Sequence, residues 1–223
     1  MVEETREVMS AEEMAALSKQ YTMFDWVPQN AVAPQPVEYA KGVYMYTPDG
    51  DRVLDFNSQL MSVNIGHGDQ RVIDAITAQA QKVCYVHPYT ATEPRAALGR
   101  KLAEITPGDL DVWFFTNGGA EANENAIRIA RHYTGRQKIL ARSRSYHGAV
   151  GATIVATGDP RRWGGEIGVS GIVRAPDFHT WGKPDPEPVD VALRELEEVI
   201  MYEGPQNIAG FILEPIVGTN GIL

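Results

Sequence analysis

One segment of the chain combines two glycines with the start of a helix, an arrangement that could bind an anion. Residues 116–124 read Thr-Asn-Gly-Gly-Ala-Glu-Ala-Asn-Glu, after an apolar run and at the start of helical periodicity. Gly118 and Gly119 let the backbone approach a ligand closely, and the free N–H groups at the helix N-terminus favour phosphate. Spacing alone leaves a phosphate site and a plain glycine turn open. It matches neither the Rossmann pattern nor the P-loop.

Two further segments carry side chains suited to ligand binding. Tyr146 and His147 follow a second apolar run. An aromatic ring beside a phosphate loop suits stacking on a planar ligand, although residues that only pack are the alternative. Glu214 ends the apolar run 208–213, where a carboxylate is costly unless it is paired. A structural salt bridge is the favoured interpretation of Glu214 alone, and a gate or ligand contact is the functional one.

Regular elements must position these segments. Apolar patterns and turn signals predict helices over 10–20, 69–83, 95–105, 121–133 and 189–201, and strands over 42–46, 52–56, 112–115, 138–141, 153–156, 172–173 and 208–213. Residues 47–50 predict a hairpin between the first two strands, and residues 176–188 a surface loop. Because the later strands alternate with helices, the fold is predicted to be α/β, a mostly parallel sheet with helices on both faces. Ligands of such sheets bind beyond the carboxyl ends of the strands, where the three segments lie.

The composition narrows the class of protein. The 223 residues carry a net charge of -9 and are 43% hydrophobic, which allows one sizeable core. An acidic chain does not favour nucleic acid or an anionic membrane surface as a partner. Cys84 is the only cysteine, so neither an intrachain disulfide nor a cysteine-based zinc site is expected. No other metal site is predicted, and Cys84 is expected to be a small buried side chain.

The N-terminal residues bear on the cellular compartment in which the protein is expected. They are acidic and no apolar stretch follows them, so no signal peptide is predicted. No apolar run is long enough to span a bilayer. Cytoplasm is therefore the expected location, and no membrane partner is expected.

Taken together, the motifs resemble those of a known family. Asn64-Ile65-Gly66-His67-Gly68, residues 116–131, Tyr146-His147-Gly148 and Glu214-Pro215 occur in the order and approximate spacing of the class III (omega) aminotransferases. The resemblance runs from about Phe24 to Leu223. It implies the fold type I architecture, a pyridoxal 5'-phosphate cofactor and a homodimer with its active site at the subunit interface. It also implies transfer of an amino group from an amine or amino acid to a keto acid such as pyruvate.

The resemblance assigns roles to the three segments. Gly119 and Ala120 would hold the cofactor phosphate through backbone N–H groups, with Gly118 before them. Tyr146 would stack on the pyridine ring, and His147 would lie beside it. Glu214 would act as a gate that, in several family members, pairs with a mobile arginine and so lets one pocket accept both an amine and an acidic keto acid.

The resemblance also places three residues in the substrate pocket. Trp26, Met61 and Tyr89 would line it, and Tyr89 would reach into the partner subunit's site. Two positions depart from the family pattern. Many members have Ser or Thr where Ala120 stands, which removes one hydroxyl contact to phosphate. Met61 stands where amine:pyruvate members often have Trp, so their amine pocket is not a close analogy.

The remaining expectations concern the catalytic residues, the domain boundaries and the alternative functions. The family's pyridine-pairing aspartate and its Schiff-base lysine both lie after the Glu214 segment, so no catalytic residue is expected in this chain, and the chain alone is expected to be inactive. Residues 1–60 would form an N-terminal segment and part of the small domain, and residues 61–223 the N-terminal portion of the large, cofactor-binding domain. The alternatives are a non-catalytic truncated or split subunit, or an aminomutase or decarboxylase on the same scaffold.

Overall fold

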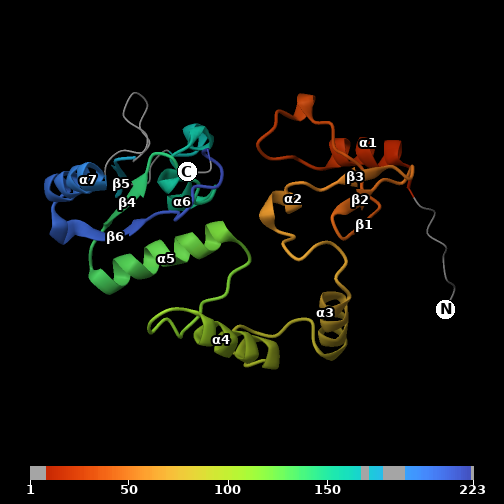
Figure 1. Cartoon of the computed structure of the whole chain (residues 1–223), viewed down its shortest axis with the longest axis horizontal. Coiled ribbons are helices and arrows are strands. Elements are labelled where there is room, and N and C mark those ends of the chain that lie inside the picture. The colour runs from red at the N-terminus through yellow and green to blue at the C-terminus, as the bar shows by residue number, and fades with distance from the viewer. Residues whose placement is uncertain (1–8, 167–170, 178–188, 222–223) are drawn as a thin grey trace. The chain divides into compact units, whose positions relative to one another are not determined.

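Figure 1 shows the computed structural model of the chain, which describes residues 9–166, 171–177 and 189–221. The chain divides into two compact units, Met1–Ala96 and Ala97–Leu223. Helix α4 (Glu93–Ile105) runs across the division. The predicted boundary between small-domain and large-domain parts after residue 60 stays a prediction. Most of the predicted loop over 176–188 lies outside the described residues.

A small antiparallel sheet characterises the first unit. Helix α1 (Ala11–Tyr21) starts at Ser10, whose hydroxyl accepts the N–H of Glu13, and the short helix η1 (Gln29–Ala31) follows it. The strands are β1 (Tyr39–Lys41), β2 (Tyr44–Tyr46) and β3 (Arg52–Leu54), in the order β1-β2-β3. The predicted hairpin is confirmed, because β2 and β3 pair antiparallel and Gly50 adopts the positive φ (88°) that its turn requires. Strand β1 was not predicted.

Two helices complete the first unit. Helix α2 (Ser58–Met61) is a left-handed turn, with positive φ at all four of its residues. Helix α3 (Gln70–Lys82) is the predicted helix, and Asp69 caps it by accepting the N–H of Arg71. Cys84 lies just beyond α3 and is exposed, so its expected burial is wrong. Its Sγ donates to the carbonyl of Ala80, one turn back in the helix.

The second unit is built around a parallel sheet. Its elements are α5 (Gly119–Thr134), β4 (Lys138–Arg142), α6 (Gly151–Ala156), η2 (Pro160–Gly164), β5 (Ile172–Ala175), α7 (Val189–Glu203), η3 (Pro205–Asn207) and β6 (Ile208–Ile212). The strand order is β5-β4-β6, and both pairs are parallel. The chain crosses from β4 to β5 through α6 and back from β5 to β6 through α7. The two crossovers run in opposite directions along the sheet. Because crossovers between parallel strands are right-handed, α6 and α7 lie on opposite faces of the sheet (Figure 1).

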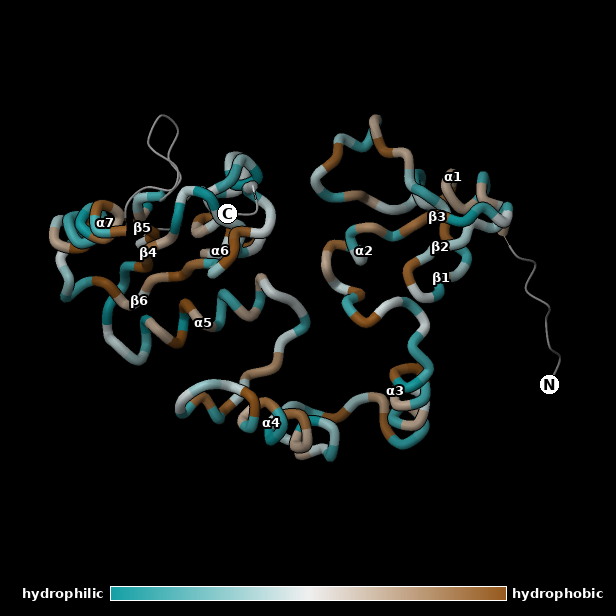
Figure 2. Tube along the Cα trace, viewed as in Figure 1, coloured by the Kyte–Doolittle hydropathy of each residue, from teal (hydrophilic) through white to brown (hydrophobic). Residues whose placement is uncertain are grey.

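The core of this unit forms where α5 and α6 meet the sheet. Ile127 of α5, Ile139 of β4 and Ala152 of α6 are buried together, and Ile172 and Ile212 pack against them. Figure 2 shows hydrophobic residues along β6 and an alternation of hydrophobic and hydrophilic residues along α5. This pattern agrees with a helix that buries one face, as its periodicity predicted.

Two predicted strands are wrong. Residues 112–115 form no strand, and Val112 is 89% exposed, because no strand of the described residues pairs with this apolar run. Residues 153–156 belong to helix α6 although they include the β-branched Thr153 and Ile154. Partners from outside the helix satisfy both of its ends. Glu124 accepts the N–H of Thr153 (2.7 Å), and Arg174 donates to the carbonyl of Ala156 (2.7 Å).

Candidate functional site

The N-terminus of α5 is an open helix end. Gly118 precedes the helix with extended backbone, and no side chain among the described residues caps the first turn. A Cβ built on Gly118 or Gly119 would meet no atom within 4 Å, so the backbone there faces open space. Glu121 folds back and accepts the N–H of Asn117 (3.0 Å), one residue before the cap. The N–H groups at the start of α5 therefore remain available to an anion.

Gly148 joins the predicted stacking segment to this helix end. A Cβ at Gly148 would lie 2.7 Å from the Cβ of Ala120 and 2.6 Å from Oγ1 of Thr153, and Gly148 has a φ of 139°. Asn123 adds a second link, because its Nδ2 donates to the carbonyl of His147 (2.8 Å). Two segments that are separate in the sequence are thus brought together, although no strand precedes the first of them as the sequence had predicted.

The backbone of His147 is fixed by a threonine. Oγ1 of Thr157 accepts the N–H of His147 (3.0 Å) and lies 2.9 Å from the carbonyl oxygen of Gly148. The side chain of His147 is 5% exposed, and its Nε2 has no hydrogen-bond partner among the described residues. Burial lowers the pKa of His147, with Glu214 opposing the shift and Arg174 adding to it. A lowered pKa keeps the imidazole neutral at pH 7.

Tyr146 is held at its backbone and at its ring. Its N–H donates to Oε1 of Glu214 (2.9 Å), 68 residues later in the chain. The guanidinium carbon of Arg161 lies 4.1 Å from the centroid of the Tyr146 ring. This distance is that of a cation–π contact, so the orientation of the ring is restrained as well as its position.

The carboxylate of Glu214 joins two backbone segments. Oε1 accepts the N–H of Tyr146 and Oε2 accepts the N–H of Gly218 (3.2 Å). Within the described parts of the chain Glu214 forms no ion pair, so its partners there are backbone donors. Each carboxylate oxygen can accept more than one hydrogen bond. The gate role assigned by resemblance stays a prediction.

The other predicted pocket residues lie in the first unit. Trp26 and Met61 adopt left-handed backbone, with φ of 61° and 62°, and both side chains are half or more exposed. Tyr89 is 96% exposed. Their expected place in a substrate pocket stays a prediction.

The sequence interpretation missed several residues of the site. Arg161 and Thr157 contact the predicted residues and belong to no motif. Asn123 lies inside the glycine-rich motif, but no role was predicted for its side chain. The sequence contained a pattern that could have predicted the short helix η2, which carries Arg161. Asp159 followed by a proline is typical of a helix start, and Asp159 does cap η2 by accepting the N–H of Arg161 (2.9 Å).

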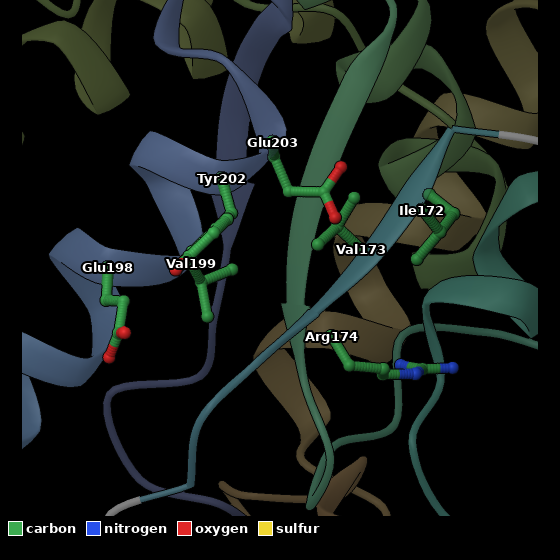
Figure 3. Close-up of a pocket in the computed structure, with 7 residues that line it drawn as sticks. All are labelled: Ile172, Val173, Arg174, Glu198, Val199, Tyr202 and Glu203. Atoms are coloured by element: carbon green, nitrogen blue, oxygen red, sulfur yellow. The ribbon is translucent and has the colours of Figure 1, made fainter.

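A separate hollow of about 580 Å³ lies between β5 and α7. Figure 3 shows the residues that line it, which are Ile172, Val173, Arg174, Glu198, Val199, Tyr202 and Glu203. None of the predicted site residues is among them. This hollow is therefore distinct from the site at the start of α5.

Gly148→Ala is expected to disrupt the junction between α5 and the Tyr146 segment. The new methyl group would overlap Ala120 and Thr153 in a backbone conformation that alanine rarely adopts. We expect a loss of about 1–3 kcal/mol in the free energy of unfolding, measured by denaturant titration. Gly164→Ala is the control, because a Cβ there meets nothing within 4 Å. Equal stability of the two variants would contradict the close junction.

Comparison with known proteins places this chain in a family. Residues 27–223 match the family described as Aminotransferase class-III. The chain is 29% identical over 227 residues to the putrescine–pyruvate aminotransferase of Pseudomonas aeruginosa, covering 95% of this chain and 50% of that protein. It is 32% identical to an omega-aminotransferase of Caulobacter vibrioides, covering 85% of this chain and 46% of that protein.

Solved structures agree with this placement. The taurine:2-oxoglutarate aminotransferase of Bifidobacterium kashiwanohense, solved with PLP and glutamate, matches with a TM-score of 0.88 at 38% identity, over 97% of this chain and 50% of that one. An (S)-enantioselective omega-transaminase of Thermomicrobium roseum matches with a TM-score of 0.90 at 35% identity, over 97% of this chain and 52% of that one.

The predicted architecture is confirmed by these likenesses, since the chain shares the α/β fold of fold type I transaminases. It spans about half the length of the relatives that it matches. The fold, the motifs and the family match over most of its residues lead to one conclusion: the chain belongs to the class III aminotransferase family.

Proposed function

We propose that the protein containing this chain moves an amino group from an amine or amino acid to a keto acid such as pyruvate, with pyridoxal 5'-phosphate as its cofactor. The observation that carries the proposal is the junction at Gly148, where the open end of α5 lies against the segment of Tyr146 and His147. This junction joins the backbone segment that carries Tyr146 and His147 to the helix end whose N–H groups can bind an anion. The relatives' names, putrescine–pyruvate and taurine:2-oxoglutarate aminotransferase, support transfer between an amine and a keto acid.

The residues present fit a phosphate-bearing planar cofactor. The N–H groups of Gly119 and Ala120 would hold the phosphate, with Gly118 giving the room for close approach. Ala120 offers no hydroxyl, so the helix end supplies backbone donors only at this position. When bound, the cofactor supplies an electron sink for the carbon that carries the amino group, while protein groups orient it.

Tyr146 and His147 would hold the ring of the cofactor. Tyr146 would stack on it, since its own position is fixed by Glu214 and Arg161. His147 would lie beside it as a neutral imidazole, and its buried, unpartnered Nε2 suits a further polar group at this site. The proposed role of Tyr146 and His147 is to hold the cofactor ring, and neither is proposed to remove a proton from the substrate carbon.

The family resemblance assigns substrate selection to four residues. Glu214 would act as the gate, exchanging an arginine partner when an acidic keto acid replaces an uncharged amine. Its hydrogen bonds to two backbone N–H groups leave lone pairs for such a partner. Trp26, Met61 and Tyr89 would line the amine pocket, with Tyr89 contributed to the partner subunit.

A homodimer in the cytoplasm is the proposed setting of this activity, on the family resemblance. No helix within the described ranges is long and apolar enough to cross a membrane. A non-catalytic split subunit, an aminomutase and a decarboxylase are the alternatives. The transaminase names of the relatives favour amino transfer over these three.

The proposal is tested on the full-length gene product. We expect pyridoxal phosphate to bind and putrescine or taurine to donate an amino group to pyruvate or 2-oxoglutarate, measured as the amino acid formed. A protein that binds no pyridoxal phosphate would contradict the cofactor assignment. Cofactor binding with release of carbon dioxide, or with an amino group moved within one molecule, would instead support the alternative reactions.

Tyr146→Ala is expected to weaken cofactor binding in the same protein without unfolding it. The lost stacking should cost about 0.5–1.5 kcal/mol beyond the loss of buried area, so the dissociation constant of pyridoxal phosphate should rise several-fold. Tyr133→Ala is the control, because Tyr133 lies near the other end of α5 and is 90% exposed. An unchanged dissociation constant in Tyr146→Ala would rule out the stacking role.

A further inference from the structure

Arg161 contacts the proposed cofactor site, yet no motif includes it. It lies in η2, and its guanidinium carbon is 4.1 Å from the centroid of the Tyr146 ring. The same guanidinium is held by Asp159, whose Oδ2 accepts from Nε of Arg161 at 2.9 Å and also pairs with its terminal nitrogen. The side chain of Asp159 is 5% exposed and that of Arg161 is 27% exposed. A buried carboxylate thus holds a partly exposed cation against an aromatic ring.

We propose that Arg161 is a positioning residue for cofactor binding, which acts by fixing the ring of Tyr146. This inference rests on the proposed function, because it concerns the ring that would stack on pyridoxal phosphate. A guanidinium covers one face of the ring, so a planar ligand can stack only on the opposite face. The contact also restricts rotation of the ring, which lowers the entropy lost when the cofactor binds.

The chain of contacts restrains Tyr146 from two directions. Glu214 binds its backbone N–H, and Arg161 binds its ring. Asp159 fixes Arg161 because it accepts both the backbone N–H and the side chain of that residue. Nδ2 of Asn220 lies 3.5 Å from Oδ2 of Asp159 and extends the network toward the end of the described chain.

The charge state of Asp159 suits this role. Burial opposes ionisation of its carboxyl, but the hydrogen bonds and charge of Arg161 outweigh burial and hold the pKa below its usual value. The carboxylate therefore stays charged at neutral pH. It can therefore pair with Arg161 at neutral pH.

The test is a double-mutant cycle on cofactor affinity in the full-length gene product. Arg161→Met removes the cation and keeps much of the side-chain length. We expect the dissociation constant of pyridoxal phosphate, measured by equilibrium dialysis, to rise roughly three- to tenfold. The circular dichroism of the bound cofactor should also fall, because an unrestrained ring holds it less uniformly. In the Tyr146→Ala background, Arg161→Met should change the dissociation constant by less than about twofold.

Arg162→Met is the matched control from the same short helix. Arg162 pairs with Glu166 rather than with the ring, so cofactor affinity should stay at the wild-type value. Arg161→Lys keeps the charge without the planar group, and it should fold even if the methionine variant does not. We expect it to lower affinity less than Arg161→Met does.

Three results would overturn the inference about Arg161. The first is wild-type affinity in both Arg161 variants. The second is an effect of Arg161→Met that persists in the Tyr146→Ala background, as a direct contact with phosphate would give. The third is an equal effect of Arg162→Met. Failure of the wild-type protein to bind pyridoxal phosphate would contradict the proposed function instead, so the two failures are distinguishable.

Discussion

Asp177→Ala is expected to lower the free energy of unfolding by about 3–5 kcal/mol, because it leaves a buried arginine without its carboxylate. Oδ1 of Asp177 pairs with Arg142 at 3.0 Å, and the two side chains are 4% and 7% exposed. Oδ2 accepts the N–H of Arg144 (2.9 Å), so the start of the loop that carries Tyr146 loses a partner as well. Urea titration of the full-length gene product measures the loss.

An exposed acid provides the control for this prediction. Glu104 pairs with Lys101 at 2.9 Å on α4, with both side chains more than half exposed. Such pairs contribute little because water screens them, so Glu104→Ala should change stability by no more than about 0.5 kcal/mol. Similar small losses in Asp177→Ala and Glu104→Ala would show that the Arg142 pair is not a buried structural link.

Glu214→Gln should raise the dissociation constant of pyridoxal phosphate roughly tenfold or more. Both carboxylate oxygens accept backbone N–H groups, from Tyr146 and Gly218, whereas an amide offers one oxygen and a second donor. One N–H would then face another donor, and the loss of a charge-assisted hydrogen bond is worth about 1.5–3 kcal/mol. Glu197→Gln, at an exposed position on α7, is the control.

The same variant tests the proposed gate once cofactor is saturating. If Glu214 exchanges an arginine partner during the reaction, Glu214→Gln leaves that arginine available to carboxylates throughout. Dicarboxylic keto acids should then bind as well as before, while transfer from uncharged amines slows. Single-turnover rates of the two half-reactions separate these effects. A parallel fall of both rates would end the gate proposal and leave Glu214 as a residue that only positions Tyr146.

Local signals in the sequence predicted much of the fold. The predicted helices over 10–20, 69–83 and 121–133 agree closely with α1, α3 and α5. Ser10 and Asp69 cap the starts of α1 and α3, and Gly135 ends α5 with left-handed backbone. The hairpin between β2 and β3 follows from its turn residues, and β4, β5 and β6 from their apolar runs. These interactions span few residues, so the sequence near each element contains the information that forms it.

Helix α6 is an element that its local sequence did not predict. Its β-branched residues favour a strand, but Glu124 and Arg174 supply hydrogen bonds at its two ends from other elements. The apolar run 112–115 shows the reverse case, since a strand forms only when another strand pairs with it, and none of the described residues does so. In both cases partners distant in sequence decided between helix, strand and loop.

The candidate site divides in the same way. The sequence by itself determined the glycine-rich start of α5, the neighbouring tyrosine and histidine, and the family, because these are motifs of fixed order and spacing. Only the tertiary structure placed Arg161 on the ring of Tyr146 and Glu214 on its N–H. Those contacts join residues 15 to 68 positions apart. Their geometry depends on the packing of the loops after β4 and β6, which no local pattern encodes.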